Sequence, residues 1–299
     1  MDSSFEGFLL LFTSVQNSSG NETMRSVTEF TAELSKSVAL RVYSNTRPYN
    51  LKIAGLQKGL VFVHEGAEQV GEGGGFGLPI LIYQDETYFS GSSAVSAGRK
   101  GSVTWIQKAY LMDHVNRTKF KNVSLHSAKA RIVMKQLAAL YRKNKFLQFL
   151  ALRELSLSLG VESVYLKKAP VGRLEVNYEI AGQTVNVMVD CSQINRKGLE
   201  KIVVLNEQSA NFFRIYLDSN ETQTIDGQIP SWERVTSEWA CLMNPDRRIG
   251  YRLWDIENGL LHRGRETLPN FLDWAGLDYE FLPQKDFFEY KIQLLGVNS

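Results

Sequence analysis

The chain has 299 residues, 43% of them apolar, so it can bury a large core in one extended domain or two ordinary ones. Its 34 basic and 32 acidic residues leave a formal charge of +2, which does not predict a general polyanion binder. Cys191 and Cys241 are too few for a disulfide framework or a cysteine zinc site, so we expect two buried thiols in a reducing compartment, a single bridge being the alternative.

Short β-type runs separated by Gly, Asn, Asp and Ser predict antiparallel strands throughout residues 1–120. The stretch Met24–Lys36 fits either a strand or a short helix, and we favour a strand. The other expected strands are Phe8–Val15, Val38–Tyr43, Leu51–Ile53, Leu60–His64, Leu78–Tyr83, Thr87–Phe89 and Val103–Val115.

The composition changes within residues 121–160. From Ser127 to Leu159 there is no Gly or Pro, and Ala, Leu, Lys, Arg and Gln dominate, which predicts a helical segment. One helix, or two with a bend near Lys143–Lys145, fits the apolar spacing equally well.

Strand patterns return in residues 161–299. A hairpin is expected at Ala181–Gln183, between the runs Arg173–Ile180 and Thr184–Val189, and Leu268–Ala275 resembles a short helix. Further strands are expected at Lys201–Leu205, Asn211–Leu217, Trp232–Leu242, Ile249–Asp255 and Phe287–Leu294. The sequence therefore predicts a mainly β fold, a large antiparallel sandwich with a central helical segment, in three regions: 1–120, 121–160 and 161–299.

An acidic, glycine-rich loop at Glu65–Phe76 is the most unusual local feature. Five glycines lie between residues 71 and 77, and they let another backbone or a ligand approach closely. Glu65, Glu68 and Glu72 repel one another, which can raise one pKa enough for proton transfer. No Lys-Ser or Lys-Thr follows and a strand comes next, so the loop is neither a P-loop nor a dinucleotide fingerprint. It is either a bulged turn with hydrated acids or a ligand loop.

The residues Leu60–Glu65 and Gly73–Leu81 resemble the early region of galactose mutarotase-like proteins, in which a strand leads through a glycine-rich stretch into a Pro-containing strand. The resemblance covers about 25 residues and implies a β-supersandwich with carbohydrate as ligand. The His acid and Glu base of the epimerases stand in characteristic contexts. Those contexts are missing around His114, His126 and His262, so we carry over no epimerase residue.

A second patch combines aromatic and charged residues. Trp and Tyr faces beside carboxylates and Arg are typical of sugar sites, although large aromatics on alternating strand positions also serve as core or cross-strand pairs. It consists of Trp232–Arg234, Glu238–Trp239, Tyr251–Asp255 and His262–Glu266, and the proposed ligand contacts within it are Trp232, Glu233, Trp239, Arg252 and Trp254. A carboxylate pair formed by Glu233 or Glu238 with Glu72 would require the fold to bring them together.

The expected helix is basic on one face, which fits a solvated or internally paired surface, or a nucleic-acid or protein partner. The residues concerned are Lys129, Arg131, Lys135, Arg142, Lys143 and Lys145.

We therefore expect a carbohydrate-active or carbohydrate-binding protein whose ligand lies between the glycine-rich loop and the aromatic patch. Glu72 or Glu65 would donate or accept a proton, His64 and Arg252 would orient, and Glu68 and Phe76 would contact the ligand. The alternative is a non-enzymatic nucleic-acid or protein-binding protein that uses the basic helix 127–153. Neither a cofactor nor a metal is predicted, no run of about 18 apolar residues predicts a membrane-spanning helix, and a cytoplasmic location is expected.

Overall fold

The computed structural model describes residues 24–45, 57–71, 74–84, 86–120, 161–220, 222–225, 229–246, 248–268 and 272–297. Within these ranges the regular structure is β-strand and the pairings are antiparallel, which confirms a mainly β, antiparallel fold. The described part contains no helix long and apolar enough to cross a membrane. The predicted helical segment, with its six basic residues, lies outside these ranges.

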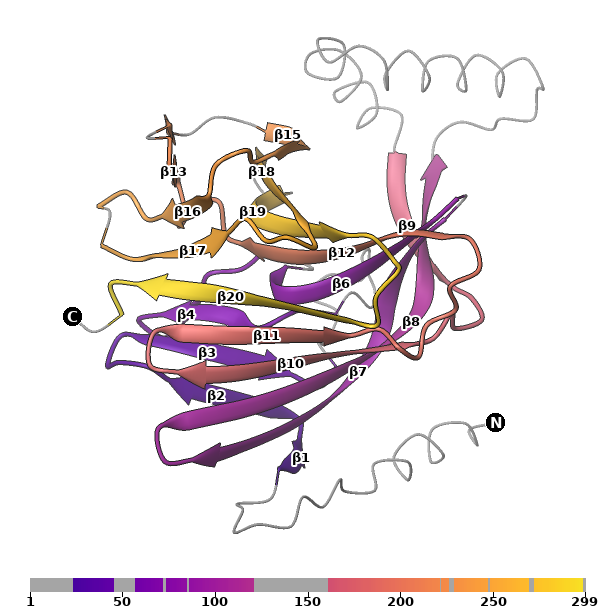
Figure 1. The fold of residues 1–299 in the computed structure, drawn as a ribbon, viewed down its shortest axis with the longest axis horizontal. Coiled ribbons are helices and arrows are strands. Elements are labelled where there is room, and N and C mark those ends of the chain that lie inside the picture. Colours follow the sequence, from indigo (N-terminus) through magenta and orange to yellow (C-terminus); the bar gives the residue numbers. More distant parts are fainter. Residues whose placement is uncertain are drawn as a thin grey trace.

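Sixteen of the described strands form one large sheet (Figure 1). Its main path, in spatial order, is β14 (Gln223–Ile225), β13 (Ile215–Asp218), β16 (Trp239–Met243), β17 (Gly250–Trp254), β20 (Phe287–Leu295), β11 (Thr184–Asp190), β10 (Arg173–Ala181), β8 (Val103–Phe120), β7 (Thr87–Lys100), β6 (Gly75–Tyr83), β12 (Leu199–Gln208), β19 (Leu272–Phe281), β18 (Leu260–Leu268) and β15 (Ile229–Arg234). Off this path, β1 (Arg25–Val27) pairs with β7 and β9 (Val161–Lys167) pairs with β8. A second sheet has the order β2 (Glu29–Glu33), β3 (Val38–Tyr43), β4 (Val61–His64) and β5 (Ala67–Glu68).

Alternating side chains explain the strands at the centre of the sheet. In β10 the residues Leu174, Val176, Tyr178 and Ile180 are buried while the residues between them are more exposed, because successive side chains of a strand point to opposite faces. The predicted hairpin to β11 is confirmed, since Ala181 pairs with Thr184 across a two-residue turn. Its first residue, Gly182, has φ +57°, as a type II′ turn requires.

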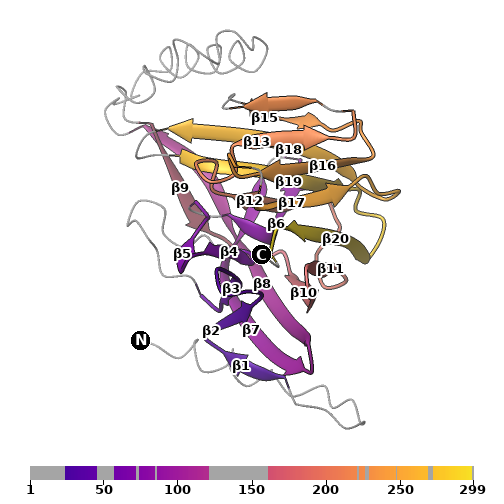
Figure 2. The ribbon, with the colours of Figure 1, turned by 90° about the vertical axis from the view of Figure 1, so that its left-hand side faces the viewer.

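The large sheet folds back on itself, so that strands far apart in its order face each other (Figure 2). Six strands separate β17 from β12, yet Tyr251 Oη donates to the Asn206 carbonyl at 2.8 Å. Tyr290 Oη donates to Asn206 Oδ1 at 2.8 Å and Tyr279 Oη donates to the Trp254 carbonyl at 2.5 Å. The core between the two facing parts thus contains large tyrosines whose hydroxyls are satisfied.

Two long polar side chains join the small sheet to the large one. Gln208 of β12 accepts from Phe62 N and donates to the Leu60 carbonyl, both at 3.3 Å. Lys108 of β8 donates from Nζ to the carbonyls of Tyr43 at 2.7 Å and Lys58 at 2.6 Å. These contacts fix the small sheet against the core.

Several local predictions can be compared with these elements. The strand interpretation of Met24–Lys36 is confirmed by β1 and β2, and Cys191 and Cys241 are free and buried. The helix expected at Leu268–Ala275 is wrong, because the segment is divided between β18 and β19, and β19 forms hydrogen-bonded ladders with β12 on one edge and β18 on the other.

The single strand expected at Trp232–Leu242 is also wrong. The chain leaves β15 at Arg234 and enters β16 at Trp239. β15 pairs with β18, whereas β16 pairs with β13 and β17, so the run crosses from one part of the sheet to another. Trp232 and Trp239 consequently belong to different parts of the fold.

Candidate functional site

One face of β12, β19 and β18 carries an unusual group of acidic and aromatic side chains. Glu207 pairs with Gly276, and Gly276 pairs with Gly264, so these three positions lie side by side on the same face. Residues two positions along each strand share that face. They include Asp278 and Trp274 on β19 and Glu266 on β18. We call Glu207, Asp278, Glu266 and Trp274 the acidic face.

Glu207 and Asp278 meet over Gly276. A Cβ atom at residue 276 would stand 2.7 Å from Glu207 Cγ and 3.0 Å from both carboxylate oxygens of Asp278, so only glycine leaves room for the pair. Asp278 is 1% exposed. Its Oδ1 accepts from Asn206 N at 2.7 Å, and its Oδ2 is buried with no hydrogen-bond partner within the described part of the chain. An unpaired buried carboxyl oxygen is costly, which makes this atom available to a ligand.

Burial dominates the electrostatics of this pair. Burial raises the pKa of Asp278 to about 7, against the opposing effect of the Asn206 hydrogen bond. Burial, followed by the negative charges of Asp278 and Glu266, raises the pKa of Glu207 well above its usual range. The two carboxyls therefore retain at least one proton near neutral pH, so the pair can both donate and accept.

Trp274 and Glu266 form the neighbouring part of the acidic face. They are opposite each other on β19 and β18, and Trp274 Nε1 donates to Glu266 Oε2 at 3.2 Å. A Cβ at Gly264 would stand 2.6 Å from the Trp274 ring and 3.0 Å from Trp232 Cδ1. The two indoles therefore lie over a glycine, and Trp232, which was predicted from the sequence, borders the acidic face.

The glycines of the predicted loop serve close backbone packing. A Cβ at Gly71 would stand 2.3 Å from the Asp273 carbonyl oxygen, and one at Gly74 would stand 2.9 Å from the Glu207 carbonyl oxygen. Gly75 has φ +115° and packs against Gly59. The two flanks of the loop thus touch β12 and β19 beside the acidic face. Glu72 itself lies outside the described residues.

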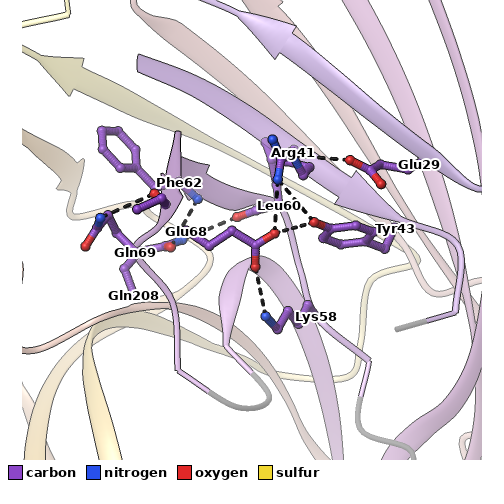
Figure 3. A network of polar contacts seen from close by, with 10 residues as sticks. Glu29, Arg41, Tyr43, Lys58, Leu60, Phe62, Glu68, Gln69 and Gln208 are labelled. Atoms are coloured by element: carbon purple, nitrogen blue, oxygen red, sulfur yellow. Dashed lines mark hydrogen bonds and ion pairs between the residues drawn. The ribbon is translucent and has the colours of Figure 1, made fainter. Parts of the chain in front are cut away.

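Glu68, a predicted ligand contact, takes part in an internal polar network (Figure 3). Its carboxylate accepts from Lys58 Nζ at 3.1 Å and Arg41 at 3.5 Å, and it forms a short hydrogen bond with Tyr43 Oη. Burial alone would raise the pKa of Glu68, but the Tyr43 hydrogen bond and the Lys58 charge outweigh it and lower the pKa. Glu68 is therefore held as a paired anion.

The other two predicted residues of this segment lie apart from that network. Glu65 has φ +50° and is exposed in the turn between β4 and β5. The ring of His64 lies 5.2 Å from that of Phe212. Within the described ranges, no three of His, Cys, Asp and Glu converge in an arrangement that could hold a metal ion.

The predicted aromatic patch is divided between two places. Trp239 and Trp254 are directly opposite each other on β16 and β17, and the guanidinium of Arg252 stacks 4.2 Å from the Trp239 ring. Glu233 lies on β15 and pairs with Arg263 at 3.2 Å. Phe76 is fully buried, edge-on to Tyr251. Cross-strand pairing thus accounts for Trp239 and Trp254, and core packing for Phe76.

Sequence reasoning included Glu266 in the aromatic and charged patch but missed Glu207, Trp274 and Asp278. Trp274, Gly276 and Asp278 alternate as they would on one strand, but the stretch Leu268–Ala275 was expected to be a short helix. Glu207 stands in a strand that was expected to end at Leu205. The alternation of Trp274, Gly276 and Asp278 was the one available signal.

Comparison with known proteins gives two similar solved structures. The α-N-acetylgalactosaminidase NagBb from Bifidobacterium bifidum, solved in complex with GalNAc, aligns at a TM-score of 0.47 with 10% identity, covering 91% of this chain and 36% of that chain. The Slr1438 protein from Synechocystis sp. PCC 6803 aligns at a TM-score of 0.35 with 8% identity, covering 95% and 99%. No family model and no curated protein matches the sequence. This chain spans about a third of the galactosaminidase chain, and likenesses this distant carry no argument about function.

Proposed function

We propose that the protein binds a carbohydrate on the acidic face and that the Glu207–Asp278 pair exchanges protons with a hydroxyl of that sugar. The observation that carries the proposal is the convergence of these two carboxyls over Gly276, with one buried oxygen unpartnered. The buried Asp278 and the half-buried Glu207 together hold a proton near neutral pH, as acid–base catalysts do.

The chemistry of the face suits a sugar. The Trp274 indole offers an apolar surface to the C–H face of a pyranose, and Glu266, on which its N–H is anchored, accepts hydroxyl protons. The acids make a phosphate or another anion an unfavourable ligand. The flanks of the glycine-rich loop border the same strands, so we place the ligand between that loop and β12–β19 rather than against Trp239 and Trp254.

The proposal also includes a β-supersandwich fold and a cytoplasmic location. The free Cys191 and Cys241 support the location, because thiols stay reduced in the cytoplasm. Glu72 remains a proposed proton donor or acceptor of the same ligand, on the sequence argument alone.

The test is a glycan array followed by titration with galactose, glucose and N-acetylgalactosamine, using thermal shift as readout. We expect Glu207→Gln to weaken the best ligand about tenfold or more, because it removes a carboxylate that bonds a hydroxyl. The matched control is Glu200→Gln, an exposed acid on the same strand, which should leave affinity unchanged. Retention of full affinity by Glu207→Gln, or no glycan bound by the wild type, contradicts the proposal.

A further inference from the structure

Two β-bulges face each other where β7 pairs with β8. The register runs Phe89 to His114, then Ser90 to Met112, then Ser92 to Leu111, which leaves Asp113 as an extra residue on β8 and Gly91 as an extra residue on β7. The Gly91 N–H donates to Asp113 Oδ1 at 3.1 Å, so one bulge binds the other. Bulges redirect side chains and are frequent beside active sites.

The paired bulges bring two neighbouring side chains together. Consecutive residues of a regular strand point to opposite faces, yet Asp113 Oδ1 lies 2.7 Å from His114 Nδ1. The side chain of Asp113 is 3% exposed and that of His114 is 19% exposed. A Cβ at Gly91 would stand 2.0 Å from His114 Nδ1, so the arrangement requires glycine there. A buried carboxylate thus holds one ring nitrogen of a partly exposed imidazole.

This imidazole lies on the same face of the sheet as Glu207. Phe89, opposite His114, packs its ring 5.1 Å from that of Tyr165 on β9. Burial, and after it the charge of Glu207, raises the pKa of Tyr165, so these two side chains are within electrostatic reach. The ladder register connects the two positions: Phe89 shares a face with His114, and its neighbour Tyr88 is opposite Leu81 on the other face. Ile80, next to Leu81, is opposite Val203, which alternates with Leu205 and Glu207 on β12, so His114 and Glu207 share one face.

We propose that His114 is a second proton-exchanging residue for the ligand of the acidic face, with Asp113 as its positioning residue. With Nδ1–H donated to Asp113, the lone pair of Nε2 accepts a proton from a sugar hydroxyl. The imidazolium formed is stabilised by the buried carboxylate, and the same proton returns to the sugar oxygen. The ligand class rests on the proposed function, whereas the state of the imidazole does not.

The first experiment therefore needs no ligand. In ¹⁵N-histidine NMR spectra, with resonances assigned by single His→Gln variants, we expect His114 to be the Nδ1–H tautomer with Nε2 unprotonated. Asp113→Asn should convert it to a mixture of tautomers, because the neutral amide no longer favours Nδ1–H. The control is Lys167→Gln, opposite His114 on β9, which should change nothing. An Nε2–H tautomer in the wild type overturns the inference.

The second experiment adds galactose, or whichever of the three sugars binds best. We expect the Nε2 resonance of His114 to shift on saturation in the wild type, and to shift clearly less in Glu207→Gln at the lowest sugar concentration that saturates the wild type. Sugar binding that depends on Glu207 but leaves the His114 Nε2 resonance unmoved overturns the role of His114 and leaves the proposed function intact. The expected tautomer with no sugar bound by the wild type refutes the proposed function instead.

Discussion

Gly276 keeps the carboxyl pair together because it has no side chain. The side chains of Glu207, on the neighbouring strand β12, and of Asp278, two residues further along β19, occupy the space where a Cβ would stand. Its φ lies outside the left-handed region, so alanine is acceptable to the backbone and only packing opposes it. A substitution of Gly276 therefore tests the packing of Glu207 against Asp278.

Gly276→Ala should destabilise the protein by about 1–3 kcal/mol, as overpacking does, and should separate the two carboxyls. We expect sugar affinity to fall together with stability, measured by urea unfolding and by titration. The matched control is Gly98→Ala on β7, where the nearest atom, Met24 Cα, is 3.4 Å from the added Cβ and little should change. Equal stability of the two variants would contradict the packing of Glu207 and Asp278 described here.

The sequence predicted part of the surroundings of the acidic face but not the Glu207–Asp278 pair. Crowded acids and glycines pointed to the loop whose flanks, Gly71 and Gly74, do touch β19 and β12. The pair itself depends on the contact of two segments that lie far apart along the chain, and no local pattern encodes the register between Glu207 and Gly276. Glu68 illustrates the converse, because its cation partners come from two other segments and neutralise it.

The side chains of β12 connect the acidic face with the small sheet. Glu207 belongs to the acidic face, while the adjacent Gln208 points inward and bonds the backbone of β4. The side-chain amide supplies an acceptor to the Phe62 N–H of β4 and a second donor to the carbonyl of Leu60, which also accepts from Phe76 N.

Gln208→Met should cost about 1–3 kcal/mol of unfolding free energy, because it leaves the Phe62 N–H buried without a partner and removes the second donor of the Leu60 carbonyl, which still accepts from Phe76 N. Chemical denaturation checks the value. Gln107→Met on β8 is the control, since Gln107 is only partly buried and bonds a side chain, Glu175, so we expect less than about 1 kcal/mol. The interpretation fails if both variants lose the same amount.

Strand positions were the most predictable part of the fold. The runs at Val38–Tyr43 and Thr184–Val189 alternate clearly and became β3 and β11 with nearly unchanged bounds. The wrong predictions concern segments whose secondary structure depends on the strands with which they pair. Leu268–Ala275 has helical spacing of leucines, but ladders on both edges of β19 outweigh that weak local preference.

Across the whole molecule, two buried groups oppose each other in their effect on stability. Asp278 has a pKa raised by burial to about 7 from an ordinary 3.8, so its contribution is complete below pH 4 and is lost as the pH rises to 7. Lys108 has a pKa lowered to about 7 from 10.5, by burial first and by the Lys58 charge second. Its contribution is complete above pH 10.5 and is lost as the pH falls through 7.

We therefore expect stability to pass through a minimum near pH 7. On each side of the minimum, in what we call the lower and upper limbs, the unfolding free energy can change by at most about 1.4 kcal/mol per pH unit for each proton involved. The upper limb should be followed only between pH 7 and 9, because burial also raises the pKa of Cys191 and Cys241 to about 11 and their contribution declines above pH 9. Urea unfolding at pH 5, 7 and 9 measures both limbs.

Two variants separate the limbs. Asp278→Asn should make the fall in stability from pH 5 to 7 shallower, the remainder belonging to Glu207, whose pKa burial also raises, and should leave the rise due to Lys108 in place. Lys108→Met should reduce the rise from pH 7 to 9 instead, and it should also lower stability at every pH because the Tyr43 and Lys58 carbonyls lose the Lys108 donor and the Lys58 carbonyl keeps only Tyr110 Oη at 3.4 Å. The slopes of unfolding free energy against pH, and not the absolute stabilities, test this prediction. If each variant keeps both wild-type slopes, the pH dependence belongs to other groups, and Asp278 is not the carboxyl that holds a proton near neutral pH.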